Sequence, residues 1–295
     1  MENELLSAPV RLSGKEVPGL AARVLGTALM PWGASGGAAE AIEFGEFTSG
    51  GRLSALAGQL YSFDAAMWRA PEIVAEYDDC AVGDARGGSA LFFGAALADW
   101  LCAWSSQRGR VAVALRNVAH PGDLHAVPYW LARHGYAGVV VAGLPAGETA
   151  GGVLHATVFS AASAEGTGWR YAASHEPGAV PAAARSFLAA LQHGTPSQAT
   201  FRALLQGDDV LLADEPDVTW LGEADAVIVA SPPQPLAVLA GDACAYTIDS
   251  TRFDALKARV RADGWTIPRA EWEQLMRFAD RSLIRTSERS REGAG

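Results

Sequence analysis

The segment from Arg110 to Gly143 constrains the fold most, because two short apolar runs flank a polar turn and a short helical stretch. The runs are Val111–Leu115 (VAVAL) and Gly138–Ala142 (GVVVA), and neither alternates apolar with polar residues. Short apolar runs bounded by turn residues are typical of strands buried on both faces, as in α/β proteins. The segment therefore predicts a strand, a polar turn, a short helix and a second strand.

The rest of the chain continues a mixed α/β pattern, which predicts a mixed sheet with flanking helices. Residues 61–88 read as irregular, with a solvated acidic loop at Glu76–Asp79. Elsewhere we expect helices at 17–30, 35–47, 52–60, 90–106, 179–205 (two short ones), from a cap at Thr251, and from Pro268, and strands at 153–159, 169–172, 210–212 and 224–230. We expect a lead-in at 1–9, a single α/β domain at 10–285 whose part 10–60 is helical, and a polar tail at 286–295.

Composition excludes several classes of protein. The net charge of −10 disfavours a nucleic acid or an anionic membrane surface as partner, because both require a basic patch. The three cysteines (Cys80, Cys102 and Cys244) form no C-x-x-C pair, so we expect a cytoplasmic protein without a metal site. The most apolar run, Ala90–Trp104, falls short of the roughly 20 residues that cross a bilayer.

Common catalytic motifs are missing from the sequence. It contains no G-x-x-x-x-G-K-[ST], no G-x-G-x-x-G between a strand and a helix and no H-E-x-x-H, and its G-x-S-x-G match, Gly33–Gly37, lies between two expected helices and is no strand-to-helix elbow. These absences disfavour a P-loop, Rossmann, zincin or α/β-hydrolase assignment.

The polar turn after Val111–Leu115 is the predicted site. Polar groups at the carboxyl end of a buried strand face the ligand crevice in α/β proteins. Arg116 is suited to hold a carboxylate through its planar fork, and His120 and His125 to exchange a proton near neutral pH. Each histidine also has a structural alternative, as a capping or surface residue. His134, just before Gly135, is expected to serve a helix C-terminus.

The segment also resembles the VRNS-x-HFG-x-x-x-Y stretch of the type-2 malate/L-lactate dehydrogenases. On this match Arg116, Asn117 and His120 take the family's Arg, Asn and His positions, and Tyr129 lies near its tyrosine. The resemblance implies the family's non-Rossmann fold, a 2-oxo or 2-hydroxy acid held by Arg116, Asn117 and Tyr129, and NAD or NADP as cofactor. With these we expect a small acidic metabolite as ligand and a homodimer.

Two departures from the family pattern leave the reaction open. Where the family has a histidine-bearing motif, this chain reads Glu46-Phe47-Thr48-Ser49-Gly50-Gly51-Arg52, so Gly50 replaces the proposed catalytic histidine. The family's cofactor-side motifs, T-N and G-T-N-P, have no counterpart after Ala142 in this sequence. Loss of a general acid typically lowers a rate about a hundred- to ten-thousand-fold. The alternatives are a divergent NAD(P)-dependent oxidoreductase, a non-catalytic accessory or assembly subunit, and a hydrolase-like protein that uses the histidines.

The two ends of the chain resemble a different group. Val10-Arg11-Leu12-Ser13 with Glu16, then Pro31-Trp32-Gly33, and the closing TSERSREGAG are similar to the uncharacterised bacterial family DUF3726. This resemblance implies a bacterial protein and no particular activity.

Overall fold

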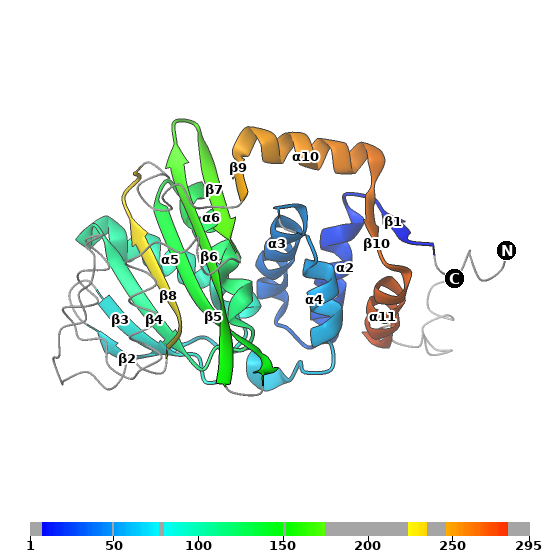
Figure 1. The fold of residues 1–295 in the computed structure, drawn as a ribbon, viewed down its shortest axis with the longest axis horizontal. Coiled ribbons are helices and arrows are strands. Elements are labelled where there is room, and N and C mark those ends of the chain that lie inside the picture. Colours follow the sequence, from blue (N-terminus) through cyan, green and yellow to red (C-terminus); the bar gives the residue numbers. More distant parts are fainter. Residues whose placement is uncertain are drawn as a thin grey trace, which may run out of the picture. The chain divides into compact units, whose positions relative to one another are not determined.

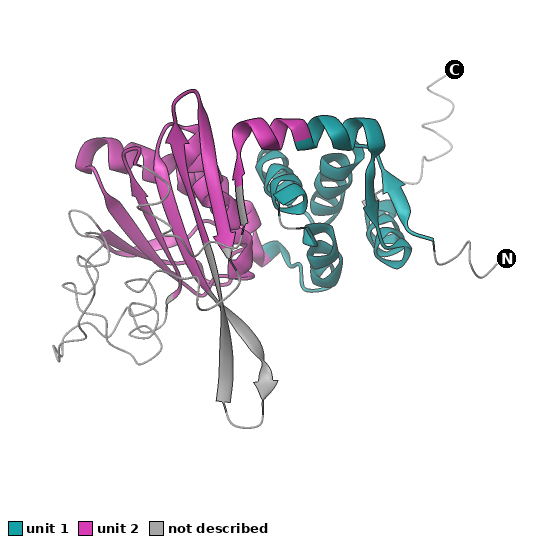
Figure 2. Ribbon diagram, turned by 45° about the horizontal axis from the view of Figure 1, so that its top comes forward, with its two compact units in different colours: residues 1–65, 256–295 teal, residues 66–255 magenta. Residues whose placement is uncertain are grey.

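The computed structural model describes residues 8–48, 50–76, 80–149, 152–174, 224–234 and 246–282. Its contacts divide the chain into two compact units, formed by residues 1–65 with 256–295 and by residues 66–255 (Figure 2). The boundary falls within helix α10 (Ser250–Asp263). The predicted single domain at 10–285 stays a prediction, as do the lead-in and the tail.

The first unit is mainly helical, as the sequence predicts for residues 10–60. The bounds are β1 (Val10–Leu12), α2 (Glu16–Thr27), α3 (Trp32–Thr48), α4 (Arg52–Gln59), β10 (Trp265–Ile267), α11 (Arg269–Ala279) and the short 3-10 helix η5 (Asp280–Ser282). Strands β1 and β10 pair antiparallel. The backbone N–H of Ser13 donates to Glu16 Oε2, at the first residue of α2, over 2.6 Å. This hydrogen bond holds the pKa of Glu16 below its usual value.

A buried carboxylate ties three elements of this unit together. Glu46 lies in α3, and its side chain accepts two hydrogen bonds. The backbone N–H of Leu53, at the start of α4, donates to Oε2 at 2.7 Å, and the indole Nε1 of Trp265 donates to Oε1 at 2.8 Å. Gly51, which precedes α4, has no side chain to cap the helix, so Glu46 performs that role from α3.

The second unit is built on an eight-stranded mixed sheet (Figure 1). The strand order is β2-β3-β4-β8-β5-β6-β7-β9; β3 and β4 pair parallel, and the other neighbours pair antiparallel. The bounds are β2 (Glu72–Glu76), β3 (Cys80–Asp84), β4 (Val111–Arg116), β5 (Ala137–Thr149), β6 (Gly152–Glu165), β7 (Gly168–Ser174), β8 (Ala224–Ser231) and β9 (Tyr246–Asp249). A short 3-10 helix, η1 (Ala65–Met67), precedes β2.

Helix α5 (Ala90–Arg108), the 3-10 helix η2 (Pro121–Ala126) and helix α6 (Val127–Arg133) pack on this sheet. Residues Val111–Leu115 of β4 are fully buried, as their apolar pattern predicts. Gly138 of β5 lies so close to α6 that a Cβ there would collide with the Leu131 side chain. Glycine at this position therefore allows the helix and the strand to approach closely.

Most of the predicted elements in the described residues are confirmed, with two corrections. Residues 61–88 are not irregular, because they contain β2 and β3. Helix α10 is capped by Asp249 and not by Thr251, since Asp249 Oδ1 accepts from the backbone N–H of Arg252 at 2.7 Å. The helices predicted at 179–205, the strand at 210–212, Cys244 and the tail lie outside the described residues. No helix among the described residues is long and apolar enough to cross a membrane.

Candidate functional site

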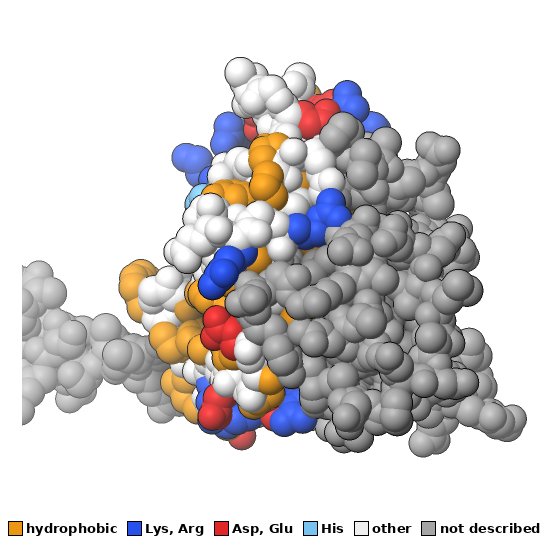
Figure 3. Space-filling model, turned by 90° about the vertical axis from the view of Figure 1, so that its left-hand side faces the viewer, with side chains coloured by type: hydrophobic (Ala, Val, Ile, Leu, Met, Phe, Trp, Pro, Cys, Tyr) orange, Lys and Arg blue, Asp and Glu red, His pale blue; other side chains and the backbone are white. Residues whose placement is uncertain are grey.

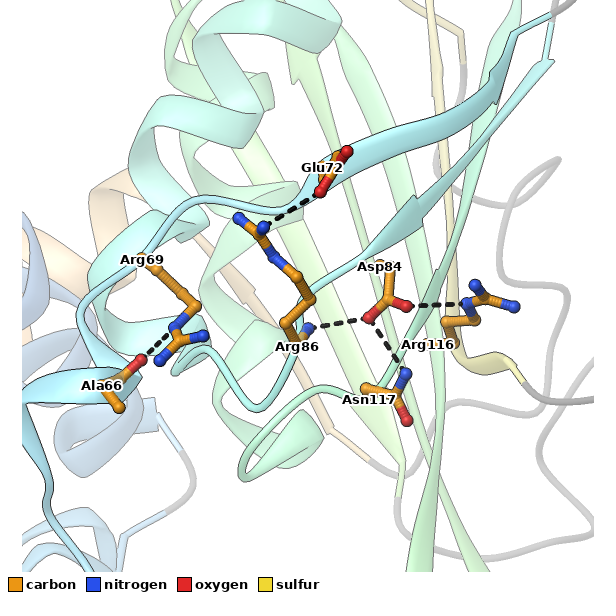
Figure 4. Close-up of polar contacts among 7 residues, drawn as sticks. All are labelled: Ala66, Arg69, Glu72, Asp84, Arg86, Arg116 and Asn117. Atoms are coloured by element: carbon orange, nitrogen blue, oxygen red, sulfur yellow. Dashed lines mark hydrogen bonds and ion pairs between the residues drawn. The ribbon is translucent and has the colours of Figure 1, made fainter.

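The carboxyl ends of the parallel strands β3 and β4 bring an acidic and a basic side chain together (Figure 4). Asp84 ends β3 and is in register with Arg116, which ends β4. Arg116 Nε donates to Asp84 Oδ2 at 3.1 Å, and Asn117 Nδ2 donates to Oδ1 at 2.9 Å. The Asp84 and Arg116 side chains are 16% and 26% exposed, so the pair is sheltered but reachable.

Asp84 is held in its ionised form. The side-chain hydrogen bond from Asn117 is the largest cause of a lowered Asp84 pKa; the backbone N–H of Arg86, at 2.8 Å, and the charge of Arg116 lower it further. Figure 4 shows the terminal guanidinium nitrogens of Arg116 on the side away from Asp84. Asp84 therefore orients Arg116 through Nε, while the outer edge of the guanidinium points elsewhere.

Two loops are joined behind this cluster by backbone hydrogen bonds. The N–H of Ala85 donates to the carbonyl of Arg116 at 2.9 Å, that of Gly87 to Asn117 at 2.7 Å, and that of Ala119 to Gly88 at 2.9 Å. Arg86, Asn117 and His120, which are not glycines, have φ values of 51°, 55° and 55°. Non-glycine residues with positive φ persist where their surroundings hold them, and they concentrate at functional sites.

A second carboxylate, Asp225, lies at the start of β8. Its Oδ2 accepts from the backbone N–H of Val118 at 2.7 Å, and the N–H of Asn117 also donates to this carboxylate. Burial raises the pKa of Asp225, and the nearby charge of Asp84 raises it further. The site therefore contains two carboxyl groups whose pKa values are shifted in opposite directions.

An ion pair extends the cluster toward the edge of the sheet. Arg86 and Glu72 of β2 are 2.9 Å apart, with side chains 50% and 60% exposed, and Arg69 Nε donates to the carbonyl of Ala66 (Figure 4). On the face of the molecule at this edge, hydrophobic side chains lie exposed among charged ones (Figure 3). Ile73 and Val74 of β2, 40% and 46% exposed, are the large apolar residues exposed on this strand.

The structure brings only some of the predicted site residues together. Arg116 and Asn117 meet at Asp84, and His120 follows on the same loop, half-buried, as the residue before η2. His125 is buried within η2, 3% exposed, with Nδ1 3.2 Å from the carbonyl oxygen of Gly122. The roles assigned to these residues stay predictions.

Tyr129 lies in a buried aromatic cluster. Its ring is 5.1 Å from that of Trp169 and 6.0 Å from that of Phe253, and Arg133 lies over it at 5.5 Å. These contacts give Tyr129 a packing role. Its predicted contact with a substrate stays a prediction.

The sequence analysis also names His134 and Gly50, the second as the position where the family pattern has a histidine. His134 directly follows α6, at the helix C-terminus where the sequence places it. Its Nε2 also lies 3.3 Å from Asp99 Oδ1. Gly50 belongs to the first unit, with φ 74°, and its N–H donates to the carbonyls of Gly45 and Glu46.

The turn between β3 and α5 contains Gly87 and Gly88, and its N–H groups donate within the chain. Gly87 donates to Asn117, Gly88 to Ala85 and Ser89 to Met67, while the Ser89 hydroxyl accepts from the N–H of Leu91. A dinucleotide pyrophosphate needs such N–H groups to be available. The turn therefore does not fit a dinucleotide, in line with the absence of a G-x-G-x-x-G motif. Within the described residues, no group of three or more His, Cys, Asp or Glu side chains is arranged to hold a metal ion.

Comparison with solved structures shows the fold. Malate dehydrogenase from Entamoeba histolytica is similar with a TM-score of 0.61 at 9% identity, over 94% of this chain and 99% of that one. Sulfolactate dehydrogenase from Methanocaldococcus jannaschii gives 0.58 at 16%, over 92% and 97% of the two chains. Delta1-piperideine-2-carboxylate reductase from Pseudomonas syringae gives 0.55 at 14%, over 91% and 99%. No family model and no curated protein sequence matches the chain.

The predicted fold class is therefore confirmed. The chain has the mixed α/β fold of the type-2 malate/lactate dehydrogenases. At 9–16% identity, these likenesses concern the fold and not the reaction.

Proposed function

We propose that this protein binds a small acidic metabolite at the ends of β3 and β4 and is a divergent NAD(P)-dependent oxidoreductase of 2-oxo or 2-hydroxy acids. The observation that carries the proposal is the Asp84–Arg116–Asn117 cluster, in a chain with the fold of 2-hydroxy-acid dehydrogenases. Asp84 orients Arg116 through Nε, and the terminal guanidinium nitrogens lie on the side away from Asp84 (Figure 4). The amide of Asn117 and the imidazole of His120 lie on the same loop.

The assignment of each group follows its chemistry. Arg116 supplies charge-assisted hydrogen bonds to a carboxylate, and such bonds contribute about 1.5–3 kcal/mol each. His120 is the proposed proton donor or acceptor, because Gly50 replaces the histidine of the family pattern. The cofactor part rests on the fold alone, since the turn before α5 does not fit a dinucleotide. The assignments to DUF3726 and to a homodimer in the cytoplasm are likewise proposals.

A titration tests the binding site and the cofactor separately. NADH and NADPH are titrated against intrinsic tryptophan fluorescence, with and without pyruvate or oxaloacetate, and turnover is followed by loss of nicotinamide absorbance. Arg116→Ala is compared with Arg110→Ala, because Arg110 lies just before the opposite end of β4 and hydrogen-bonds Gln234 at 3.2 Å. We expect Arg116→Ala to weaken binding of the 2-oxo acid by about tenfold or more and Arg110→Ala to leave it unchanged.

Each half of the proposal has its own contrary result. Failure of both dinucleotides to bind at millimolar concentration contradicts the oxidoreductase. Equal affinity of the two arginine variants for the 2-oxo acid contradicts the site. His120→Ala should slow turnover while ligand affinity is kept, and unchanged turnover removes His120 from the proposal.

An apolar tip on the first unit favours a second candidate, a non-catalytic assembly subunit. Leu29, in the turn after α2, and Trp32, the first residue of α3, are 72% and 92% exposed, and Leu29 has a φ of 64°. Exposed large apolar residues of this kind mark interaction surfaces when they lie together. Trp32→Ser, measured by sedimentation velocity against wild type, should lower the oligomeric state. An unchanged state contradicts this candidate.

A further inference from the structure

A β-bulge places Asp225 beside the candidate site. Strand β8 pairs antiparallel with β4, with Ala226 opposite Leu115 and Ala224 opposite Arg116. Asp225 is therefore the extra residue of the bulge, between two paired positions. Bulges bend a strand and re-aim a side chain, and they are frequent next to active sites.

The bulge directs the carboxylate onto the loop that follows β4. The N–H groups of both Asn117 and Val118 donate to it, the second at 2.7 Å. These are the two residues immediately after Arg116, and Asn117 has a φ of 55°. In this conformation the Asn117 amide reaches Asp84 at 2.9 Å.

We propose that Asp225 is a positioning residue of the candidate site, whose carboxylate holds the backbone of Asn117 and Val118 so that Arg116 and Asn117 are presented to a small anionic ligand. The loop geometry belongs to the chain itself, and only its consequence for ligand binding rests on the proposed function. Sequence patterns did not single out Asp225.

Opposing interactions act on the ionised form of Asp225. Burial and the facing carboxylate of Asp84 both disfavour the ionised form, while the two N–H donors favour it; the charged side chain on the neighbouring strand β4 is Arg116. An ionised acceptor makes stronger hydrogen bonds than a neutral one. Protonation of Asp225 should therefore loosen the loop, although the carboxyl group remains in place.

Amide hydrogen exchange on the full chain tests the proposal without any ligand. The variants are Asp225→Ala and Asp225→Asn, with Asp249→Ala as matched control, because Asp249 also accepts a backbone N–H at 2.7 Å but caps α10. In Asp225→Ala we expect protection of the Asn117 and Val118 amides to fall by about tenfold or more, as for loss of a hydrogen bond to a charged group. Asp249→Ala should leave these two amides unchanged. Unchanged protection of both amides in folded Asp225→Ala overturns the proposal.

If Asp225→Ala does not fold, Asp225→Asn tests the proposal instead. It keeps an acceptor oxygen but cannot titrate, so protection of the two amides should become independent of pH, whereas wild type should lose protection as the pH falls through the Asp225 pKa. Persistence of the pH dependence in Asp225→Asn overturns the proposal.

A second readout separates positioning from general stability. With oxalate as probe and NADH present, Asp225→Ala should bind oxalate about tenfold or more weakly, and Asp225→Asn, which keeps an acceptor oxygen without the charge, should bind it with an affinity between those of wild type and Asp225→Ala. Equal affinity of wild type and Asp225→Ala for oxalate overturns the positioning role. Should wild type bind neither oxalate nor NADH, the proposed function fails, and the exchange experiment alone decides the role of Asp225.

Discussion

Replacement of Glu46 by alanine should destabilise the first unit strongly. Glu46 is 5% exposed, and its two oxygens accept from the N–H of Leu53 at 2.7 Å and from the indole of Trp265 at 2.8 Å. Removing the carboxylate leaves both donors without this acceptor; Leu53 is buried, whereas Trp265 is half-buried. An unpaired buried donor costs about 1–3 kcal/mol and a partly exposed one costs less, so we expect a loss of about 2–4 kcal/mol in the free energy of unfolding.

The measurement is urea unfolding followed by circular dichroism, with Glu43→Ala as control. Glu43 lies one turn earlier in α3 and pairs with Lys257 at 2.9 Å, both partly exposed, so its loss should cost about 1 kcal/mol or less. A double-mutant cycle with Trp265→Phe isolates the indole contribution, for which we expect a coupling of about 1–2 kcal/mol. If Glu46→Ala costs no more than Glu43→Ala, the reasoning that these donors depend on Glu46 is wrong.

Three further predictions concern the second unit. Gly138→Ala should destabilise the chain by about 1–3 kcal/mol in urea unfolding, because its Cβ would collide with the buried Leu131; a loss near zero would show that α6 can shift. Because the pKa of Asp84 is lowered in the folded chain, its stabilising contribution is full above the unfolded value of about 3.9 and is lost as the pH falls through the folded value. Asp84→Asn should accordingly show less acid destabilisation between about pH 5 and pH 2 than wild type, and equal slopes would contradict the assignment. Burial raises the pKa of Cys102 to about 11, so this thiol should react with iodoacetamide at pH 8 far more slowly in the native chain than in urea; equal rates would contradict the shift.

The sequence predicted the elements whose signals are local. The VAVAL run became the buried strand β4, the apolar stretch from Ala90 became α5, and the turn with Arg116 and Asn117 lies at the end of β4. Period and composition are sufficient for such elements, because a buried strand or an apolar helix is determined by its own residues.

The sequence could not predict the residues whose role depends on distant neighbours. Strand β3 reads CAVGD, whose small residues and glycine give a weak strand signal, so the sequence predicts an irregular region around Asp84. Asp84 and Asp225 become site residues only because their strands pair with β4. Asp84 accepts from Arg116, 32 positions away, and Asp225 accepts from Val118, 107 positions away. The sequence does hold a weak signal for each residue. Asp84 is an acid at the end of a short apolar run, and Asp225 is an acid at the start of another.

The strand order has a consequence for how this protein is made. Strand β8 lies between β4 and β5, although β4 and β5 are much closer to each other in sequence than to β8. The central strand of the sheet is therefore missing until the ribosome has synthesised residue 231. Until then the inner edges of β4 and β5 lack their native partner, and exposed apolar edges favour mispairing and aggregation. Insertion of β8 also delivers Asp225 to the loop after β4. Closure of the sheet and completion of the candidate site are thus one late event in biosynthesis, and a nascent chain that stalls before β8 has neither.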